Sequence, residues 1–190
     1  MNHLGPEESH NPWKTLSEKE IYENKWIKLT EFQVLNPAGN PGIYGVIHFQ
    51  NNAVGVVPYE NGFIWMVGQF RYPLNRFSWE IPEGGGPLDI STLEAAVREL
   101  KEETGMTAAN YEKIVEMHLS NSVSDEYAII YLATELTHGE AEPEETEELH
   151  LRKIQLEDAY ALVEKGLITD SLTVAAIYKL MLMKADGRLR

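Results

Sequence analysis

Residues 84–106 constrain the fold of this chain more than any other segment, because they predict a helix whose two ends are both defined. Ser91 and Glu94 have the spacing of a capping box at the start of a helix. Gly105 supplies the left-handed residue that commonly ends a helix, and the residues between are mostly good helix formers. The sequence therefore predicts a helix over 91–104, preceded by a loop with three consecutive glycines.

The predicted helix has an apolar side and an acidic side. Four residues follow the i, i+3, i+4, i+7 spacing of a buried stripe, namely Leu93, Ala96, Val97 and Leu100. Glu99, Glu102 and Glu103 recur at i, i+3 and i+4 on a different side. Like charges at this spacing destabilise an isolated helix by about 0.2–0.5 kcal/mol per pair, and a bound divalent cation would remove that repulsion. A metal site and a solvated acidic face are therefore two open interpretations of this helix.

The composition narrows the kinds of site that the chain could carry. It contains no cysteine, which excludes disulfides, cysteine zinc sites, thiolate nucleophiles and iron–sulfur clusters. Its six histidines lack metal-ligand spacing, and no complete G-x-G-x-x-G, G-K-[ST] or G-x-S-x-G motif occurs. Carboxylate oxygens are hard ligands, so the metal expected here is Mg²⁺, with Mn²⁺ as a substitute.

Length and charge limit the class of protein and of partner. A chain of 190 residues with 43% hydrophobic residues can form one domain with a sizeable core. Its formal net charge of -14 argues against nucleic acid or an anionic membrane surface as the main partner. The start of the sequence lacks an apolar run of signal-peptide length, and no run reaches the length of a membrane span. We therefore expect a cytoplasmic protein.

Turn signals and alternating apolar residues predict an α+β fold. Asn61-Gly62 between two apolar runs is a strong hairpin signal over 53–70. The other predicted strands cover 26–34, 43–49, 111–119 and 127–132, and the other predicted helices cover 156–165 and 171–184. We expect a loose arm over 1–12, N-terminal strands over 13–50 that form a small sheet or a dimerisation segment, and the main domain over 51–190.

The segment around the predicted helix resembles the signature of the Nudix hydrolases, G-x5-E-x7-R-E-U-x-E-E-x-G-U, where U is a bulky aliphatic residue. Eight of the nine fixed positions match, namely Gly84, Arg98, Glu99, Leu100, Glu102, Glu103, Gly105 and Met106. Ile90 is the departure, because the family has a glutamate there that pairs with the motif arginine. We expect Arg98 to use another partner, such as Asp89 or Glu94.

The similarity extends over about 22–184 and is strongest to the branch that hydrolyses ADP-ribose and nucleoside diphosphate sugars. Three further segments carry it, namely 69–73, 79–84 and 145–148. The resemblance implies an α/β/α sandwich with a mixed sheet and a small N-terminal antiparallel sheet. It also implies Mg²⁺-dependent cleavage of the pyrophosphate bond of ADP-ribose or a related sugar such as GDP-mannose. The products would be a nucleoside monophosphate and a sugar phosphate, and the enzyme would be a homodimer.

The resemblance also implies roles for particular residues. Glu99 and Glu103 would be the main metal ligands, with Glu102 and the backbone carbonyl of Glu83 completing the set. Besides Glu103, the catalytic residues would include a base in the acidic run over 140–148, where Glu145 and Glu147 are the two candidates. Taken alone, that run would be interpreted as a solvated acidic loop.

Substrate contacts are implied for three residues before the helix. Arg71 would bind phosphate, Glu80 would contact substrate, and Gly84 would let the backbone approach the phosphates closely. A surface ion pair at Arg71 and a strand-end carboxylate at Glu80 are the plainer alternatives. Tyr22 and Trp26 could stack on a base or pack in a core or interface.

Two other functions stay open. The first is a Nudix-fold sensor that binds a nucleotide sugar without cleaving it, and the second is a hydrolase of dinucleoside polyphosphates. The helix glutamates disfavour a sensor, because a sensor has no need of a metal-binding cluster.

Overall fold

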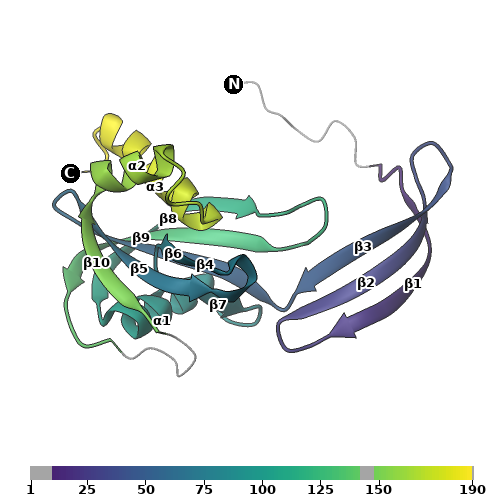
Figure 1. The fold of residues 1–190 in the computed structure, drawn as a ribbon, viewed down its shortest axis with the longest axis horizontal. Coiled ribbons are helices and arrows are strands. Elements are labelled where there is room, and N and C mark those ends of the chain that lie inside the picture. The colour runs from purple at the N-terminus through teal and green to yellow at the C-terminus, as the bar shows by residue number, and fades with distance from the viewer. Residues whose placement is uncertain (1–9, 142–147, 190) are drawn as a thin grey trace. The chain divides into compact units, whose positions relative to one another are not determined.

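The computed structural model describes residues 10–141 and 148–189 and divides the chain into two compact units (Figure 1). The first unit comprises Met1–Gln50 together with Ser120–Asp125, and the second comprises Asn51–Leu119 and Glu126–Arg190. The N-terminal unit therefore includes one short segment from far along the chain. Within the described ranges, no helix has the length and apolar character needed to cross a membrane.

Three antiparallel strands form the N-terminal unit, in the order β1-β2-β3: β1 (Lys14–Glu23), β2 (Ile27–Leu35) and β3 (Pro41–Phe49). The segment Ser120–Asp125 lies against β3, where the Ile47 amide donates to the carbonyl of Val123 at 2.8 Å. Tyr22 and Trp26 are both exposed, so neither packs in a core. The strand β1 was not predicted, because its sequence carries five charged residues and lacks a clear alternation.

Asp125 joins the segment Ser120–Asp125 to the end of β3. Its carboxylate accepts a hydrogen bond from the Phe49 amide at 2.9 Å and lies 2.7 Å from Nδ1 of His48. His48 is therefore a hydrogen-bonded side chain. Burial alone would raise the pKa of Asp125, but these hydrogen bonds outweigh it and lower the pKa below its ordinary value of 3.8.

We expect Asp125→Asn to lower the Tm at pH 7 by about 1–2 °C, the size expected for an exposed charge-assisted contact. A carboxylate with a lowered folded-state pKa stabilises the fold above its ordinary pKa, and this contribution is lost as the pH falls through the lowered value. The Tm difference between wild type and variant should therefore shrink when thermal unfolding is repeated towards pH 3. A difference that stays constant from pH 7 to pH 3 would contradict the prediction.

The second unit is built on a seven-stranded mixed sheet. Its strands are β4 (Asn51–Glu60), β5 (Phe63–Arg71), β6 (Arg76–Glu80), β7 (Glu83–Pro87), β8 (Thr107–His118), β9 (Tyr127–Thr137) and β10 (His150–Gln155). The order is β10-β5-β4-β9-β8, with β6 paired to β5 and β7 paired to β4. The pairing of β4 with β9 is parallel and the other pairings are antiparallel.

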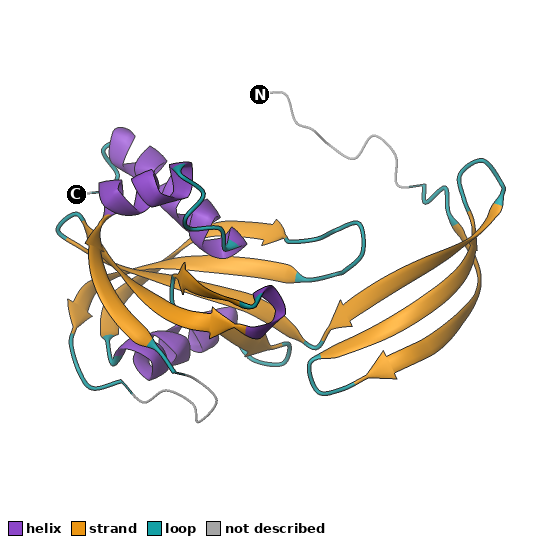
Figure 2. Cartoon of the chain, viewed as in Figure 1, coloured by secondary structure: helices purple, strands orange, loops and turns teal. Residues whose placement is uncertain are grey.

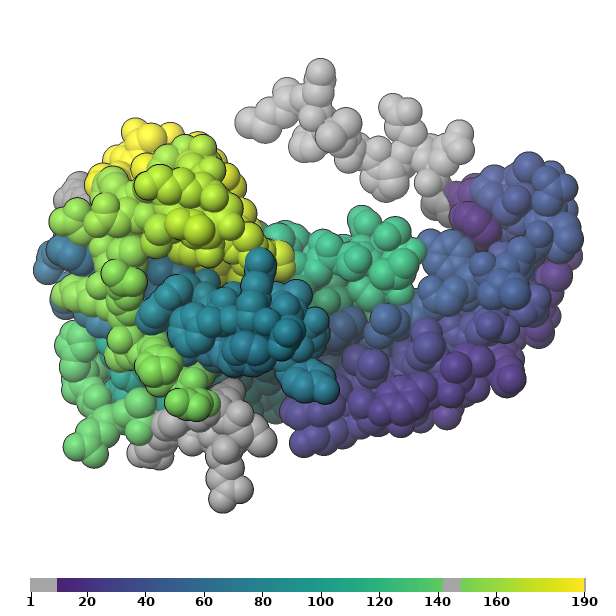
Figure 3. Space-filling view, in the orientation of Figure 1, coloured from purple at the N-terminus to yellow at the C-terminus, as the bar shows by residue number. Residues whose placement is uncertain are grey.

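Local turn chemistry explains the predicted hairpin. Asn61 and Gly62 both have positive φ, 53° and 85°, and they connect β4 to β5. After β5, a short 3₁₀ helix over Tyr72–Leu74 leads into β6. This connection is exposed at the front of the second unit in Figure 3, and Tyr72 and Leu74 present their side chains to solvent.

Helices cover both faces of the sheet (Figure 2). One core lies between the sheet and α1 (Thr92–Thr104), around Trp65, Leu100 and Met106. The other lies between the sheet and the pair α2 (Leu156–Glu164) and α3 (Ser171–Ala185). The predicted α/β/α sandwich with a mixed sheet and a small antiparallel N-terminal sheet is therefore confirmed.

The buried side of α1 differs from the predicted stripe. Leu93 and Val97 are 40% and 39% exposed, whereas Glu99 and Glu103 are only 8% and 3% exposed. The small side chains of Ala95 and Ala96 let the helix lie close to the sheet, and this orientation turns the two glutamates towards β7. The prediction of Leu93 and Val97 as core residues was wrong.

The glycine-rich segment before α1 is a strand and not the loop that its composition suggests. In β7, Gly84, Gly85 and Gly86 pair with Val54, Ala53 and Asn52 of β4. A Cβ at Gly86 would lie 2.9 Å from a Val54 methyl carbon and 3.1 Å from Cβ of Ala95. Glycine is therefore required here by the close approach of α1 to the sheet, which local propensity does not reveal.

Candidate active site

Arg71 is held by two carboxylates, one at the end of β6 and one at the start of β7. Its Nε donates to both oxygens of Glu80, at 3.0 and 2.9 Å, and its Nη2 donates to Glu80 at 2.6 Å and to Glu83 at 2.9 Å. Glu80 is fully buried and Glu83 nearly so, while Arg71 is about one-third exposed. The structure thus places Arg71 in a fixed ion-pair network and not in an isolated surface pair.

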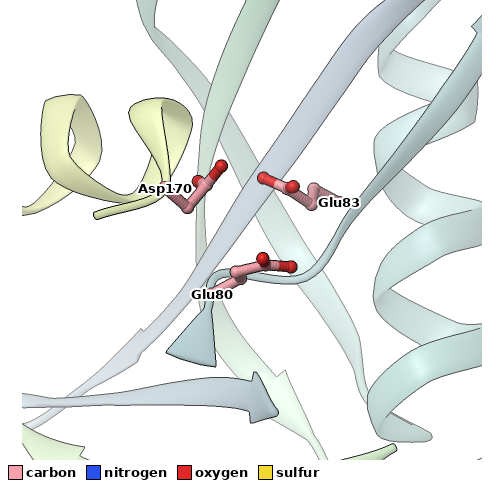
Figure 4. Close-up of side chains that lie close together, drawn as sticks. All are labelled: Glu80, Glu83 and Asp170. Carbon is pink, nitrogen blue, oxygen red and sulfur yellow. The ribbon is translucent and has the colours of Figure 1, made fainter. Parts of the chain in front are cut away.

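Asp170 joins this network from a distant part of the sequence. Carboxylate oxygens of Glu80, Glu83 and Asp170 lie within 4.8 Å of one another, and Figure 4 shows the three side chains converging from β6, β7 and the start of α3. Asp170 is also the N-cap of α3, accepting the Thr173 amide at 2.7 Å. Asp170 was not among the predicted site residues, because its position before a predicted helix indicates only a capping role.

The network changes the ionisation of its members. Burial raises the pKa of the Glu83 carboxyl well above its ordinary value, and the negative charges of Asp170 and Glu80 add to this effect. Burial alone would lower the pKa of Arg71, but the hydrogen bond and charge of Glu80 outweigh it, and the pKa is raised. Arg71 therefore remains charged, and burial favours the protonated form of the Glu83 carboxyl.

The glutamates of α1 approach the same segment from the other side. The Glu83 amide donates to Oε2 of Glu103 at 3.0 Å, which ties the helix to the first residue of β7. Arg98 Nη2 lies 2.5 Å from Oε1 of Glu99, and Arg98 Nε lies 3.6 Å from Glu102. Glu99 and Glu103 thus face the Glu83–Gly84 backbone. The Glu102 side chain is more exposed to solvent than either of them.

The partners of Arg98 correct an expectation. The sequence suggested Asp89 or Glu94 as a substitute for the missing glutamate at Ile90. Instead, besides the two α1 carboxylates, Arg98 Nη2 donates to the carbonyl of Gly85 at 2.8 Å. Arg98 projects along the helix towards β7, and its partners among the described residues all lie within the segment 84–106.

Gly84 makes room for Glu99. A Cβ added at Gly84 would collide with the carboxylate of Glu99. Because Gly84 is paired with Val54 of β4, its backbone cannot easily move aside. A glycine at this position therefore leaves space for the Glu99 carboxylate. This reason adds to the close approach of a phosphate that the sequence suggested.

The α1 glutamates and the Glu83 backbone form a set of possible ligands that fits a hard divalent cation. It consists of carboxylate oxygens and a backbone carbonyl, without sulfur or imidazole. Oε2 of Glu83 is buried and has no hydrogen-bond partner. Within residues 10–141 and 148–189, the one group of three ligand oxygens within 4.8 Å is Glu80, Glu83 and Asp170, and the α1 glutamates do not form such a group among themselves. Glu145 and Glu147 lie outside the described residues.

Comparison with known proteins places this arrangement in a family. The family model described as "NUDIX domain" matches residues 49–172, which include every described residue of the site. The chain belongs to the NUDIX family. A second model, described as "Nucleoside diphosphate sugar hydrolase N-terminal domain", matches residues 13–47 of this NUDIX protein.

Relatives match along most of the chain. This NUDIX protein is 34% identical over 174 residues to a protein of Bacillus subtilis named "ADP-ribose pyrophosphatase", covering 90% of this chain and 94% of the relative. It is 30% identical to a protein of the same name from Mycobacterium tuberculosis, covering 89% and 83%. The solved structure titled "Crystal structure of ADP compounds hydrolase" superposes with a TM-score of 0.84 at 20% identity, covering 96% of this chain and 100% of that one, and so shows the same fold.

Proposed function

We propose that this protein is a Mg²⁺-dependent hydrolase of the pyrophosphate bond of ADP-ribose or a related nucleoside diphosphate sugar such as GDP-mannose. The products are a nucleoside monophosphate and a sugar phosphate. The observation that carries the proposal is the pair of buried α1 glutamates, Glu99 and Glu103, facing the Glu83–Gly84 backbone. Relatives named as ADP-ribose pyrophosphatases support the choice of substrate class.

One group of residues binds the metal, and another group contacts the substrate and the attacking water. Glu99, Glu102, Glu103 and the carbonyl of Glu83 hold Mg²⁺, for which Mn²⁺ can substitute. When bound, the cation neutralises charge on the diphosphate and lowers the pKa of a coordinated water. Arg71 contacts the substrate and the buried Glu80 acts through Arg71, while either Glu145 or Glu147 orients or deprotonates the attacking water. Proximity of a cation keeps such a carboxylate ionised.

Arg71 is well prepared for a substrate anion. Its Nε and Nη2 are fixed by Glu80 and Glu83, and Nη1 makes no hydrogen bond to any residue in the described parts of the chain. A guanidinium held on one edge presents its other edge in a defined direction at little further entropic cost. Arg71 is therefore proposed as a phosphate ligand that Glu80 and Glu83 hold in place.

The test is a substrate panel with a coupled phosphatase. ADP-ribose, GDP-mannose, UDP-glucose and diadenosine polyphosphates lack a terminal phosphomonoester, so phosphate is released only after cleavage. Release from ADP-ribose or GDP-mannose with Mg²⁺, abolished by EDTA, is the expected result. Cleavage of the diadenosine compounds alone would change the substrate class. Calorimetric binding of a nucleotide sugar without cleavage would replace the hydrolase by a sensor.

We also propose that the protein is a cytoplasmic homodimer formed through its N-terminal unit. Large apolar side chains are exposed on this unit, namely Trp13, Leu16, Ile21, Tyr22, Trp26 and Ile43. Side chains of this kind are enriched where protein surfaces associate. The absence of cysteine suits a reducing compartment, and the acidic net charge disfavours nucleic acid as a partner.

Light scattering coupled to size exclusion should give twice the chain mass of 21.6 kDa. The double substitution of Leu16 and Ile21 by glutamate should shift the protein to the monomer, because burying two charges at an interface is costly. Leu182→Glu, at an apolar residue of α3 that is also exposed, is the control and should remain dimeric. A wild type that elutes as a monomer at micromolar concentration would refute this assembly.

A further inference from the structure

Thr173 links the first turn of α3 to the segment between β6 and β7. Its hydroxyl accepts a hydrogen bond from the Ile81 amide at 2.9 Å, and both residues are fully buried. The Thr173 amide in turn donates to the Asp170 carboxylate at 2.7 Å. One residue therefore fixes the start of a helix and a backbone amide that is distant in sequence.

The hydroxyl satisfies a donor that the sheet leaves without a partner. Ile81 and Pro82 connect the last residue of β6 to the first residue of β7, so the Ile81 amide lies outside the strand ladders. Buried backbone donors are nearly always paired, because an unpaired one loses its hydrogen bonds to water. The other buried residues of α3 are apolar, namely Leu172, Ala176, Ile177, Leu180 and Met183. A hydroxyl at this position of an apolar face is thus accounted for by Ile81.

The segment that Thr173 holds leads directly to the metal-binding residues. The Pro82 carbonyl accepts the Val56 amide at 2.9 Å, and the Glu83 amide donates to Glu103 at 3.0 Å. Contacts with α3, β4 and α1 therefore fix three successive residues. A displacement of Ile81 would be passed to the Glu83 carbonyl and to the carboxylate of Glu103.

Packing leaves this segment little freedom to adjust. Ile81 is fully buried, and a Cβ added at Gly55 would lie 2.7 Å from its Cδ1 and 3.2 Å from a methyl carbon of Leu172. The Ile81 side chain therefore fills the space between β4 and the first turn of α3. Close-packed interiors transmit small shifts and do not absorb them.

We propose that Thr173 is a positioning residue of the active site, whose hydroxyl sets the position of the Glu83 carbonyl and, through the Glu83 amide, of Glu103 for binding a divalent cation. This inference rests on the proposed metal site and extends it to a residue that touches neither cation nor substrate. Thr173 acts through two backbone amides. Its removal should therefore change cation affinity and kcat more than KM.

The test measures Mn²⁺ binding in the absence of substrate, by electron paramagnetic resonance of the free ion. Thr173→Val, which keeps the shape and removes the hydroxyl, should weaken Mn²⁺ affinity about tenfold or more, the range seen when a group that orients a metal ligand is removed. It should lower kcat by a similar factor while KM changes little. Thr173→Ser restores the hydroxyl and should return affinity and kcat to within about twofold of the wild type.

Ile177→Val is the matched control, because Ile177 is equally buried in the same helix and carries no polar group. It should lower the Tm without changing Mn²⁺ affinity. If Thr173→Val does not fold, as judged by circular dichroism, Thr173→Ala carries the same expectation. Wild-type Mn²⁺ affinity in the folded hydroxyl-free variant, an equal loss in Ile177→Val, or a wild type without saturable Mn²⁺ binding would overturn the proposal. A wild type that binds Mn²⁺ but cleaves no nucleotide sugar would instead refute the proposed function alone.

Discussion

Glu103→Gln should lower kcat by about 10²–10⁴-fold, the range over which single catalytic groups contribute, while the fold stays intact. Glu103 is almost fully buried on α1 and accepts the Glu83 amide through one carboxylate oxygen. The glutamine oxygen can keep that hydrogen bond, so the position of the side chain is retained. The negative charge that attracts a divalent cation is lost, and an amide is a poorer ligand for Mg²⁺.

The measurement is phosphate release from ADP-ribose at saturating substrate, together with Mn²⁺ affinity and circular dichroism. Glu94→Gln is the control, since Glu94 lies exposed in the first turn of the same helix. It changes one carboxylate to an amide and should leave kcat unaltered. Turnover at the wild-type rate in folded Glu103→Gln would remove Glu103 from the site, whatever its position in the motif.

Gly84→Ala should have the second largest effect, lowering kcat by about 10²-fold, because a misplacement of about 1 Å in an active site can have this cost. The added methyl group would collide with the Glu99 carboxylate. Gly84 does not have positive φ, so alanine is allowed by the backbone and the effect arises from the clash itself. Pairing with Val54 keeps β7 in place, so Glu99 must move instead.

The next residue provides a close control for this variant. A Cβ at Gly85 would meet Asn51 at 3.5 Å, which is an ordinary contact. Gly85→Ala adds the same methyl group to the same strand and should keep most of the wild-type activity and Mn²⁺ affinity. Equal losses of activity in the two variants would show that β7 tolerates no side chain. The proposed role of Gly84 in leaving space for Glu99 would then be wrong.

The limits of α1 were predictable because they depend on neighbours in sequence. Ser91 accepts the Leu93 amide and Gly105 has a φ of 70°, and both features follow from the residues themselves. The side of the helix that faces the sheet was not predictable in the same way. A period of 3.6 residues fits both the apolar stripe and the arc through Glu99 and Glu103. Which of the two is buried depends on how α1 packs against β7.

Contacts between distant segments account for what the sequence did not show. Asp170 reaches Glu83 because α3 begins beside the end of β6, and Thr173 reaches Ile81 for the same reason. No spacing within either segment indicates the other. The motif glutamates were found because they share one helix, whereas the residues around them come from elements brought together by the sheet.

The attachment of Ser120–Asp125 to the N-terminal sheet has a consequence for how such proteins can be recombined. The chain enters that unit first over Met1–Gln50 and again between β8 and β9. Exchange of the N-terminal module between relatives therefore requires two separate replacements, one at the start of the chain and one in the β8–β9 connection. A simple fusion at residue 50 would leave the amide of Ile47 without Val123 and the His48 ring without Asp125. Inheritance of this module is thus tied to the segment that connects β8 to β9.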